Sequence, residues 1–108
     1  MIKLLAIKIY SKTRLLQILD DLKKNYNIHK TYNNDWVGFK GIREGGIFVY
    51  INIESNIKLY GWDYIYKDYD KEYVPSTISN GLKHKTLIII DNDLPISAII
   101  ESNKFNLI

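Results

Sequence analysis

Residues 2–26 read IKLLAIKIYSKTRLLQILDDLKKNY, and the spacing of their apolar side chains changes partway along. Between residues 2 and 10 these side chains alternate, with Leu5, Ile7 and Ile9 on one face, which predicts a β-strand. From residue 12 to residue 26 the spacing becomes helical, and Ser11 stands where a helix N-cap is expected. The apolar stripe of the predicted helix is broad and comprises Leu15, Leu16, Ile18, Leu19, Leu22 and Tyr26.

Period-two segments follow the helix. They predict strands over residues 28–32, 36–42, 47–53 and 57–66, separated by turns at residues 33–35, 43–46 and 54–56. The clearest is IFVYINI at residues 47–53, which has an aliphatic side and an aromatic side. The aliphatic side comprises Ile47, Val49, Ile51 and Ile53, and the opposite side comprises Phe48, Tyr50 and Asn52.

The last third is less regular. Residues 67–85 are polar and contain turn residues, so they are predicted as a long loop with room for a short turn of helix. The continuous apolar run at residues 86–91 predicts a strand buried on both faces. Residues 94–102 allow either a helix or a hairpin strand, and Asp93 and Pro95 favour the helix because both suit a helix start.

These elements predict a single domain over residues 1–108 of the α+β class. One N-terminal helix is expected to pack on a mostly antiparallel sheet of about five strands. The length suits one hydrophobic core. No internal repeat or linker divides the chain.

The composition of the chain argues against several classes of function. There is no Cys, and the two His lack the spacing of a metal site, so we expect no metal, no cofactor and no enzymatic activity. No glycine-rich phosphate loop is visible. The apolar run before Lys8 spans only four residues, far shorter than a membrane span, so we expect a cytoplasmic protein with no membrane partner.

The stretch YGWDYIY at residues 60–66 carries the main functional hypothesis. On a regular strand its four aromatic residues share one face, and two interpretations of that face compete. In one, the rings pack beneath the helix as part of the core. In the other, they form an exposed aromatic face on the side opposite the helix. The predicted partner-binding residues of this face are Tyr60, Trp62, Tyr64, Tyr66, Phe48 and Tyr50.

The basic first third of the chain supports an alternative function, the binding of nucleic acid. The formal net charge is +3, and residues 1–34 contain seven Lys or Arg against two Asp. Such residues can bind nucleic-acid phosphates without regard to base sequence. The candidate nucleic-acid-binding residues are Lys8, Lys12, Arg14, Lys23, Lys24 and Lys30.

The segments NNDWVGF, GGIFVYINIES and LYGWDYIY give the chain a resemblance to small accessory proteins of phages from A/T-rich bacteria. The resemblance covers residues 13–66 and carries over no functional residue. It implies a small, cytoplasmic, non-enzymatic protein that binds and inhibits or modulates a host protein or complex, including components of host defence. A homodimer is left open.

Overall fold

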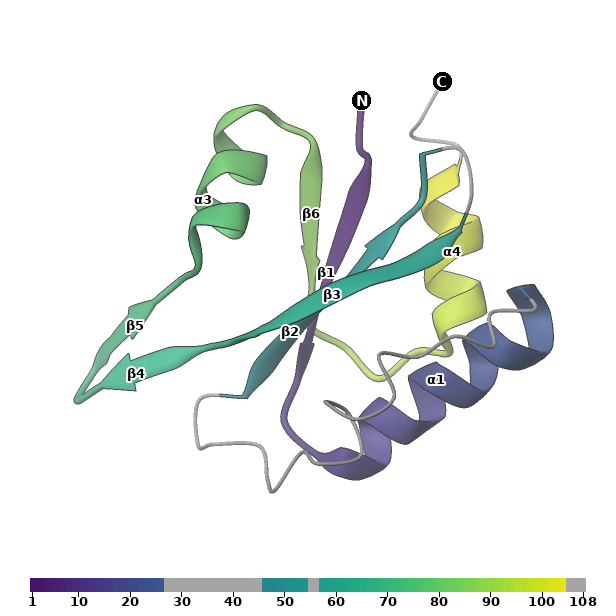
Figure 1. Ribbon diagram of the computed structural model, residues 1–108, viewed down its shortest axis with the longest axis horizontal. Coiled ribbons are helices and arrows are strands. Elements are labelled where there is room, and N and C mark those ends of the chain that lie inside the picture. Colours follow the sequence, from purple (N-terminus) through teal and green to yellow (C-terminus); the bar gives the residue numbers. More distant parts are fainter. Residues whose placement is uncertain (27–45, 55–56, 105–108) are drawn as a thin grey trace.

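The computed structural model describes residues 1–26, 46–54 and 57–104, and Figure 1 shows their arrangement. The predicted strands at 28–32 and 36–42 lie outside these residues. The elements in chain order are β1 (Leu4–Ile9), α1 (Lys12–Tyr26), β2 (Ile47–Asn52), β3 (Lys58–Tyr64), β4 (Tyr66–Asp68), β5 (Lys71–Tyr73), α3 (Ser76–Lys83), β6 (Leu87–Ile90) and α4 (Ile96–Lys104).

The main sheet has four strands in the order β3-β2-β1-β6. The predicted α+β class is confirmed, with three helices among the described residues. The expectation of one mostly antiparallel sheet of about five strands is wrong in detail. β1 runs parallel to β6, and β4 and β5 form a separate two-stranded sheet. The reason is that a hairpin and α3 intervene between β3 and β6, so β6 joins the sheet at its far edge, beside β1.

One face of the sheet is covered by α1 and α4, as Figure 1 shows. The predicted inward residues of the first strand, Leu5, Ile7 and Ile9, are fully buried there. The aliphatic side of β2 is buried on the same face of the sheet, which confirms the predicted alternation of that strand. The helices complete this core with Leu15, Ile18, Leu22, Ile96, Ile99 and Ile100.

The start of α1 follows the sequence prediction. Ser11 Oγ accepts a hydrogen bond from the Arg14 N–H at 3.2 Å, as an N-cap does. The buried stripe, however, is rotated from its predicted position. Leu16 is 54% exposed, whereas Arg14 is only 7% exposed, because the helix turns Arg14 toward the segment that joins β6 to α4.

The other face of the sheet is covered by α3. A second core forms there from Ala6, Phe48, Tyr50, Ile65, Ile78 and Leu87. The approach is close, because a Cβ added at Gly81 of α3 would lie 2.5 Å from the Leu87 Cβ. As a result β1 is buried on both faces, with Ala6 against α3 and Ile7 against the opposite layer.

Residues 67–85 are more ordered than predicted. They contain β4, β5 and α3. The C-terminus of α3 is closed by two backbone hydrogen bonds, from Thr86 N–H to Gly81 C=O and from Lys85 N–H to Leu82 C=O. Lys85 has a φ of 58°, and this left-handed residue together with the two bonds defines a Schellman motif. The chain can therefore reverse at Lys85 and enter β6.

The ambiguous C-terminal segment is a helix. α4 places Ile96, Ile99 and Ile100 on one buried side, which is the spacing of an amphipathic helix. Pro95 precedes it, and its C=O accepts the first helical hydrogen bond, from Ile99 N–H at 3.1 Å. Within the described ranges, no helix has the length and apolar character to cross a membrane.

The contact between Gly81 and Leu87 gives a first prediction. Gly81→Ala should lower the free energy of unfolding by about 1–3 kcal/mol, because the new methyl group overlaps a buried side chain. Gly61→Ala is the matched control. A Cβ at Gly61 would meet nothing within 4 Å, so its free energy of unfolding should change by less than about 0.5 kcal/mol. Urea titrations of both variants measure the difference, and equal effects would contradict the close approach of α3.

Candidate functional site

An irregularity at Tyr60 decides which aromatic side chains of β3 face the core. Ile51 lies opposite Leu59, and Tyr50 lies opposite Gly61, so Tyr60 has no partner in the ladder. This is a β-bulge, which inserts one residue and shifts the alternation of the strand. Leu59 belongs to the core beneath α1 and α4, and Trp62 packs against the same core. The predicted regular alternation is therefore broken at Tyr60, whereas Trp62 and Tyr64, opposite Val49 and Ile47, share one face as predicted.

The two predicted site residues of β2 lie in the interior. Phe48 is 1% exposed and Tyr50 is 2% exposed, both in the core beneath α3. The expectation that they belong to an exposed aromatic face is wrong. The physical reason is that α3, which lies where a long loop with room for a short turn of helix was predicted, covers the side of the sheet that was expected to be open.

The hydroxyl of Tyr50 is held inside this second core. It donates a hydrogen bond to Asp63 Oδ2 at 2.8 Å. Burial, reinforced by this carboxylate, raises the pKa of Tyr50 far above its ordinary value, and a hydrogen bond with Thr77 opposes the shift. Asp63 therefore lies on the face beneath α3, where it satisfies a buried phenol.

Two other residues of the predicted aromatic face are exposed. Tyr60 is 55% and Tyr64 is 40% exposed. Trp62 and Tyr64 meet edge to face with ring centroids 4.9 Å apart, so Trp62 orients Tyr64 from the core side. Tyr66 lies in β4, opposite Tyr73 of β5. The bulge thus separates Tyr60 from Trp62 and Tyr64, which share the face of Val49 and Ile47, with Trp62 packed on the core and Tyr64 partly open to solvent.

Beyond β3 the chain forms a projecting hairpin, which we call the arm and define as residues 66–74. It consists of β4, a two-residue turn at Tyr69 and Asp70, and β5, and Figure 1 shows it extending away from the body of the protein. Tyr69 is 92% exposed and has a φ of 53°. Tyr73 and Val74 are 46% and 41% exposed.

The predicted basic residues are not gathered into one open surface. Lys8 pairs with Glu72 of the arm at 3.2 Å, and Lys24 pairs with Asp20 at 2.9 Å. Arg14 is buried beside Asp93. The remaining candidates are Lys12 and Lys23, which are exposed on α1, and Lys30, which lies outside the described residues.

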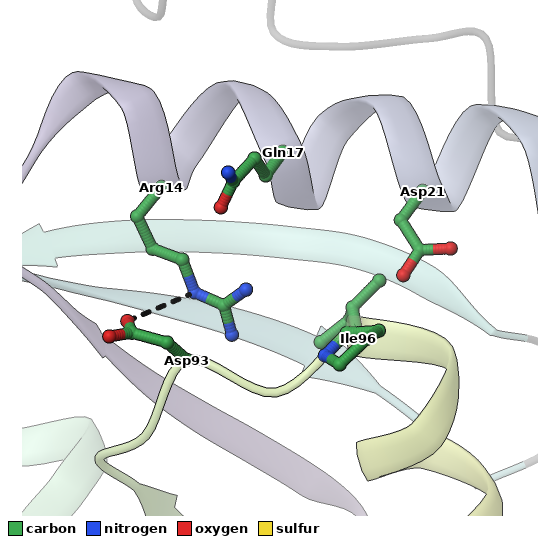
Figure 2. Close-up of a pocket in the computed structure, with 6 residues that line it drawn as sticks. Arg14, Gln17, Asp21, Asp93 and Ile96 are labelled. Carbon is green, nitrogen blue, oxygen red and sulfur yellow. Dashed lines mark ion pairs between the residues drawn. The ribbon is translucent and has the colours of Figure 1, made fainter.

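A cleft of about 290 Å³ lies between α1 and the segment that joins β6 to α4, as shown in Figure 2. Its lining combines one guanidinium with two carboxylates. The side chains that line it are Arg14, Gln17, Asp21, Asp93, Pro95 and Ile96.

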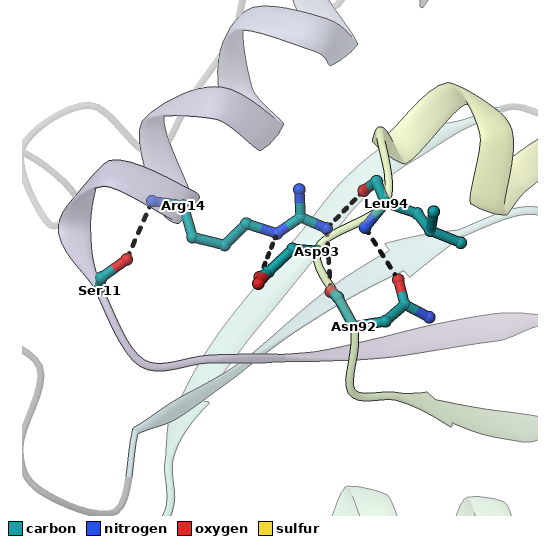
Figure 3. A network of polar contacts seen from close by, with 5 residues as sticks. All are labelled: Ser11, Arg14, Asn92, Asp93 and Leu94. Carbon is teal, nitrogen blue, oxygen red and sulfur yellow. Dashed lines mark hydrogen bonds and ion pairs between the residues drawn. The ribbon is translucent and has the colours of Figure 1, made fainter.

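Arg14 binds the loop that leads into α4, as shown in Figure 3. Its Nη2 donates to the Leu94 C=O at 2.7 Å and to the Asn92 C=O at 3.3 Å. Its Nε lies 3.8 Å from Asp93 Oδ1, an ion pair too long for a hydrogen bond. The Asp93 side chain is 96% exposed, so this ion pair contributes little, and the two carbonyl contacts carry the interaction.

Asp21 performs a related role two turns farther along α1. Its Oδ2 accepts hydrogen bonds from Ser97 N–H at 3.0 Å and from Ser97 Oγ at 3.4 Å. The amide of Asn25 donates to the other carboxylate oxygen. Asp21 therefore caps the first turn of α4 from a neighbouring helix, where a negative charge also suits the helix dipole.

The polar groups around the cleft are thus largely engaged in holding α1 to α4. Two carboxylates against one guanidinium leave the cleft unsuited to an anionic substrate. Over the part of the chain that the structure describes, no three His, Cys, Asp or Glu side chains gather as metal ligands. The cleft is best understood as a structural seam, and the exposed tyrosines of the arm are the better functional candidates.

The chain matches no protein-family model, no curated protein and no solved structure. The site must therefore be argued from its own residues. Sequence reasoning placed Tyr69 in a solvated loop and missed the arm. The available signal was the alternation of residues 71–73 after a two-residue break, but the break lacks the glycine that normally marks a tight hairpin.

The contacts of Arg14 give a second prediction. Arg14→Ala should lower the free energy of unfolding by about 2–4 kcal/mol, because it removes buried packing and leaves two carbonyls without their donor. Asp93→Asn should change it by less than about 0.5 kcal/mol, since its charge is solvated. Chemical denaturation compares the two, and a larger loss for Asp93→Asn would show that the ion pair dominates.

A third prediction concerns Tyr50. Its pKa is raised in the folded protein, so its contribution to stability is complete below the unfolded pKa of about 10 and is lost as pH rises above that value. Between about pH 10.5 and 12 the free energy of unfolding of the wild type should fall by about 1.4 kcal/mol per pH unit more than that of Tyr50→Phe. A Tyr50→Phe slope equal to that of the wild type would contradict a buried, protonated Tyr50.

Proposed function

We propose that the protein is a binding module that engages another protein through its arm, with Tyr69 at the centre of the contact. The observation that carries the proposal is the conformation of Tyr69. A non-glycine residue at positive φ is uncommon and costs of the order of 1 kcal/mol. Here that cost places a ring in solvent, where it is 92% exposed. Strain of this kind is typical of functional sites, and tyrosine is enriched in interface hot spots.

The root of the arm is fixed to the domain, which supports its use as a preorganised contact. Ile65, the residue before β4, is buried in the core beneath α3, and its N–H donates to the Gly46 C=O at 3.1 Å. Glu72 of β5 forms the ion pair with Lys8 of β1. A hairpin held at its base loses less conformational entropy on binding than a free loop would.

The chemistry of the arm favours a protein partner. Tyr69, Tyr73 and Val74 offer apolar area, and Lys71 lies 5.1 Å from the centroid of the Tyr73 ring in a cation–π contact. Asp70 adds an exposed negative charge at the tip, which would repel a phosphate backbone. The resemblance to phage accessory proteins makes a host protein the expected partner and inhibition or modulation the expected consequence.

The nucleic-acid alternative receives less support from the geometry. Lys8, Lys24 and Arg14 each have an acidic neighbour, which reduces the net attraction for phosphate. Retention on a polyanion that falls steeply with salt would nevertheless favour that alternative over the arm.

The conformation and exposure of Tyr69 give a fourth prediction. Immobilised protein should capture a host protein, and Tyr69→Asn should weaken that complex by at least about 30-fold, the loss expected of a hot spot. Asparagine adopts the left-handed conformation more readily than tyrosine, so the free energy of unfolding should stay equal or rise. Titration calorimetry of the captured partner measures the first effect, and urea titration measures the second.

Tyr10→Asn is the matched control. Tyr10 is 53% exposed and directly follows β1, outside the arm, so its replacement should preserve affinity. Equal affinity of Tyr69→Asn and the wild type would refute the proposal. Loss of binding with both variants would point to a general aromatic effect and would also refute a contact centred on the arm.

A further inference from the structure

The outer edge of β6 carries unpaired backbone groups, as far as the described residues show, because β6 ends the strand order. The Thr86 C=O accepts from Leu4 N–H at 3.1 Å and so points toward β1. Since backbone groups alternate along a strand, those of Ile88 and Ile90 also point toward β1. The N–H and C=O groups of Leu87 and Ile89 therefore point outward.

The side chains along this edge do not protect it. Leu87 is covered by α3, but Ile89 on the same face is 37% exposed, because α3 ends its close approach at Leu87. Monomeric proteins usually protect such an edge with a proline, a bulge or a central charge. The four residues of β6, LIII, contain none of these. The prediction of a strand buried on both faces is thus wrong at Ile89.

The charges at the two ends of β6 are opposite. Lys83 and Lys85 precede the strand, and Asp91 and Asp93 follow it. These four residues are exposed. An antiparallel copy of the same strand would bring the basic end of one chain to the acidic end of the other. With Ile89 opposite its own copy, Lys85, which precedes one strand, and Asp93, which follows the other, come to the same end of the pair, so the charges that flank the edge are complementary to each other.

We propose that β6 pairs antiparallel with β6 of a second copy of this chain, around a two-fold axis at Ile89, and joins two four-stranded sheets into one. Ile89 packs on Ile89 across the axis, and the outward groups of Leu87 and Ile89 become hydrogen bonded. A strand of four residues buries little area, so the dimer is weak and dissociates on dilution. This dimer contact is separate from the arm, which extends from β3 at the opposite edge of the sheet.

Sedimentation equilibrium of the full chain over a range of concentrations tests the proposal. The wild type should show a concentration-dependent monomer–dimer equilibrium. Ile89→Lys should raise the dimer dissociation constant at least about tenfold, because it places two like charges together at the axis. Leu16→Lys is the control, since Leu16 is an exposed apolar residue on α1 that lies away from β6, and it should leave the constant unchanged.

Charge reversal tests the register. Lys85→Asp places carboxylates opposite each other at both ends of the dimer, and Asp93→Lys places ammonium groups there, so each variant alone should dimerise less than the wild type. An equimolar mixture should recover dimerisation, because each carboxylate of one variant then faces an ammonium group of the other. Both positions are exposed, and circular dichroism should confirm that the variants remain folded.

Hydrogen exchange gives an independent readout. The amides of Leu87 and Ile89 should become protected as concentration rises, whereas those of Ile88 and Ile90 should be protected at all concentrations. A wild type that stays monomeric at millimolar concentration would overturn the proposal. So would a dimer that Ile89→Lys leaves intact, a mixture of charge variants that fails to recover, or protection that is independent of concentration.

Discussion

The burial of the centre of β1 on both of its faces is the constraint on which the other features depend. Ala6 faces one layer and Ile7 the other, and neither side chain is exposed to solvent. A strand that is apolar on both sides needs cover on both sides, because each exposed apolar side chain would forfeit about 1.5–3 kcal/mol of burial. α1 and α4 supply one cover, and α3 with Ile65 supplies the other. Both faces of the described sheet are then covered, which is why the proposed contact surface is the arm.

Two local features make this arrangement work. The bulge at Tyr60 shifts β3 by one residue, so that Leu59 and Trp62 both serve the core under α1 and α4 while Asp63 reaches Tyr50 on the other face. Side chains of α1 then fix the second helix of that layer. Arg14 holds the loop before α4, and Asp21 caps its first turn, so the layer is bound by polar contacts at its edge as well as by apolar burial.

The sequence correctly predicted the elements whose local residue pattern matches the environment that they occupy in the fold. The switch of period at Ser11 located α1 at residues 12–26, and the two-sided composition of residues 47–53 correctly separated the two faces of β2. It did not reveal α3, because that helix is short and contains Asn80 and Gly81, which normally interrupt helices. The parallel pairing of β6 was also hidden, since it arises from contacts distant in sequence.

The aromatic site was predictable only in part. Counting alternate residues assigned Tyr60, Trp62 and Tyr64 to one face. The bulge breaks that count at Tyr60, whereas Trp62 and Tyr64 still share the face of Val49 and Ile47. Gly61 was the available signal, because a glycine inside a strand often marks a bulge. The exposure of Tyr69 could not be read from sequence, since it depends on a turn that uses tyrosine where glycine is usual.

Hydroxyl-radical footprinting of the free protein measures directly whether both faces of the sheet are covered. Tyr50 and Tyr69 have the same chemistry, so their relative rates of oxidation report accessibility alone. Burial beneath α3 predicts slow oxidation of Tyr50 and Phe48 and fast oxidation of Tyr69. Oxidation of Tyr50 as rapid as that of Tyr69 would mean that the sheet face is open, and would contradict both the covered core and the assignment of the contact to the arm.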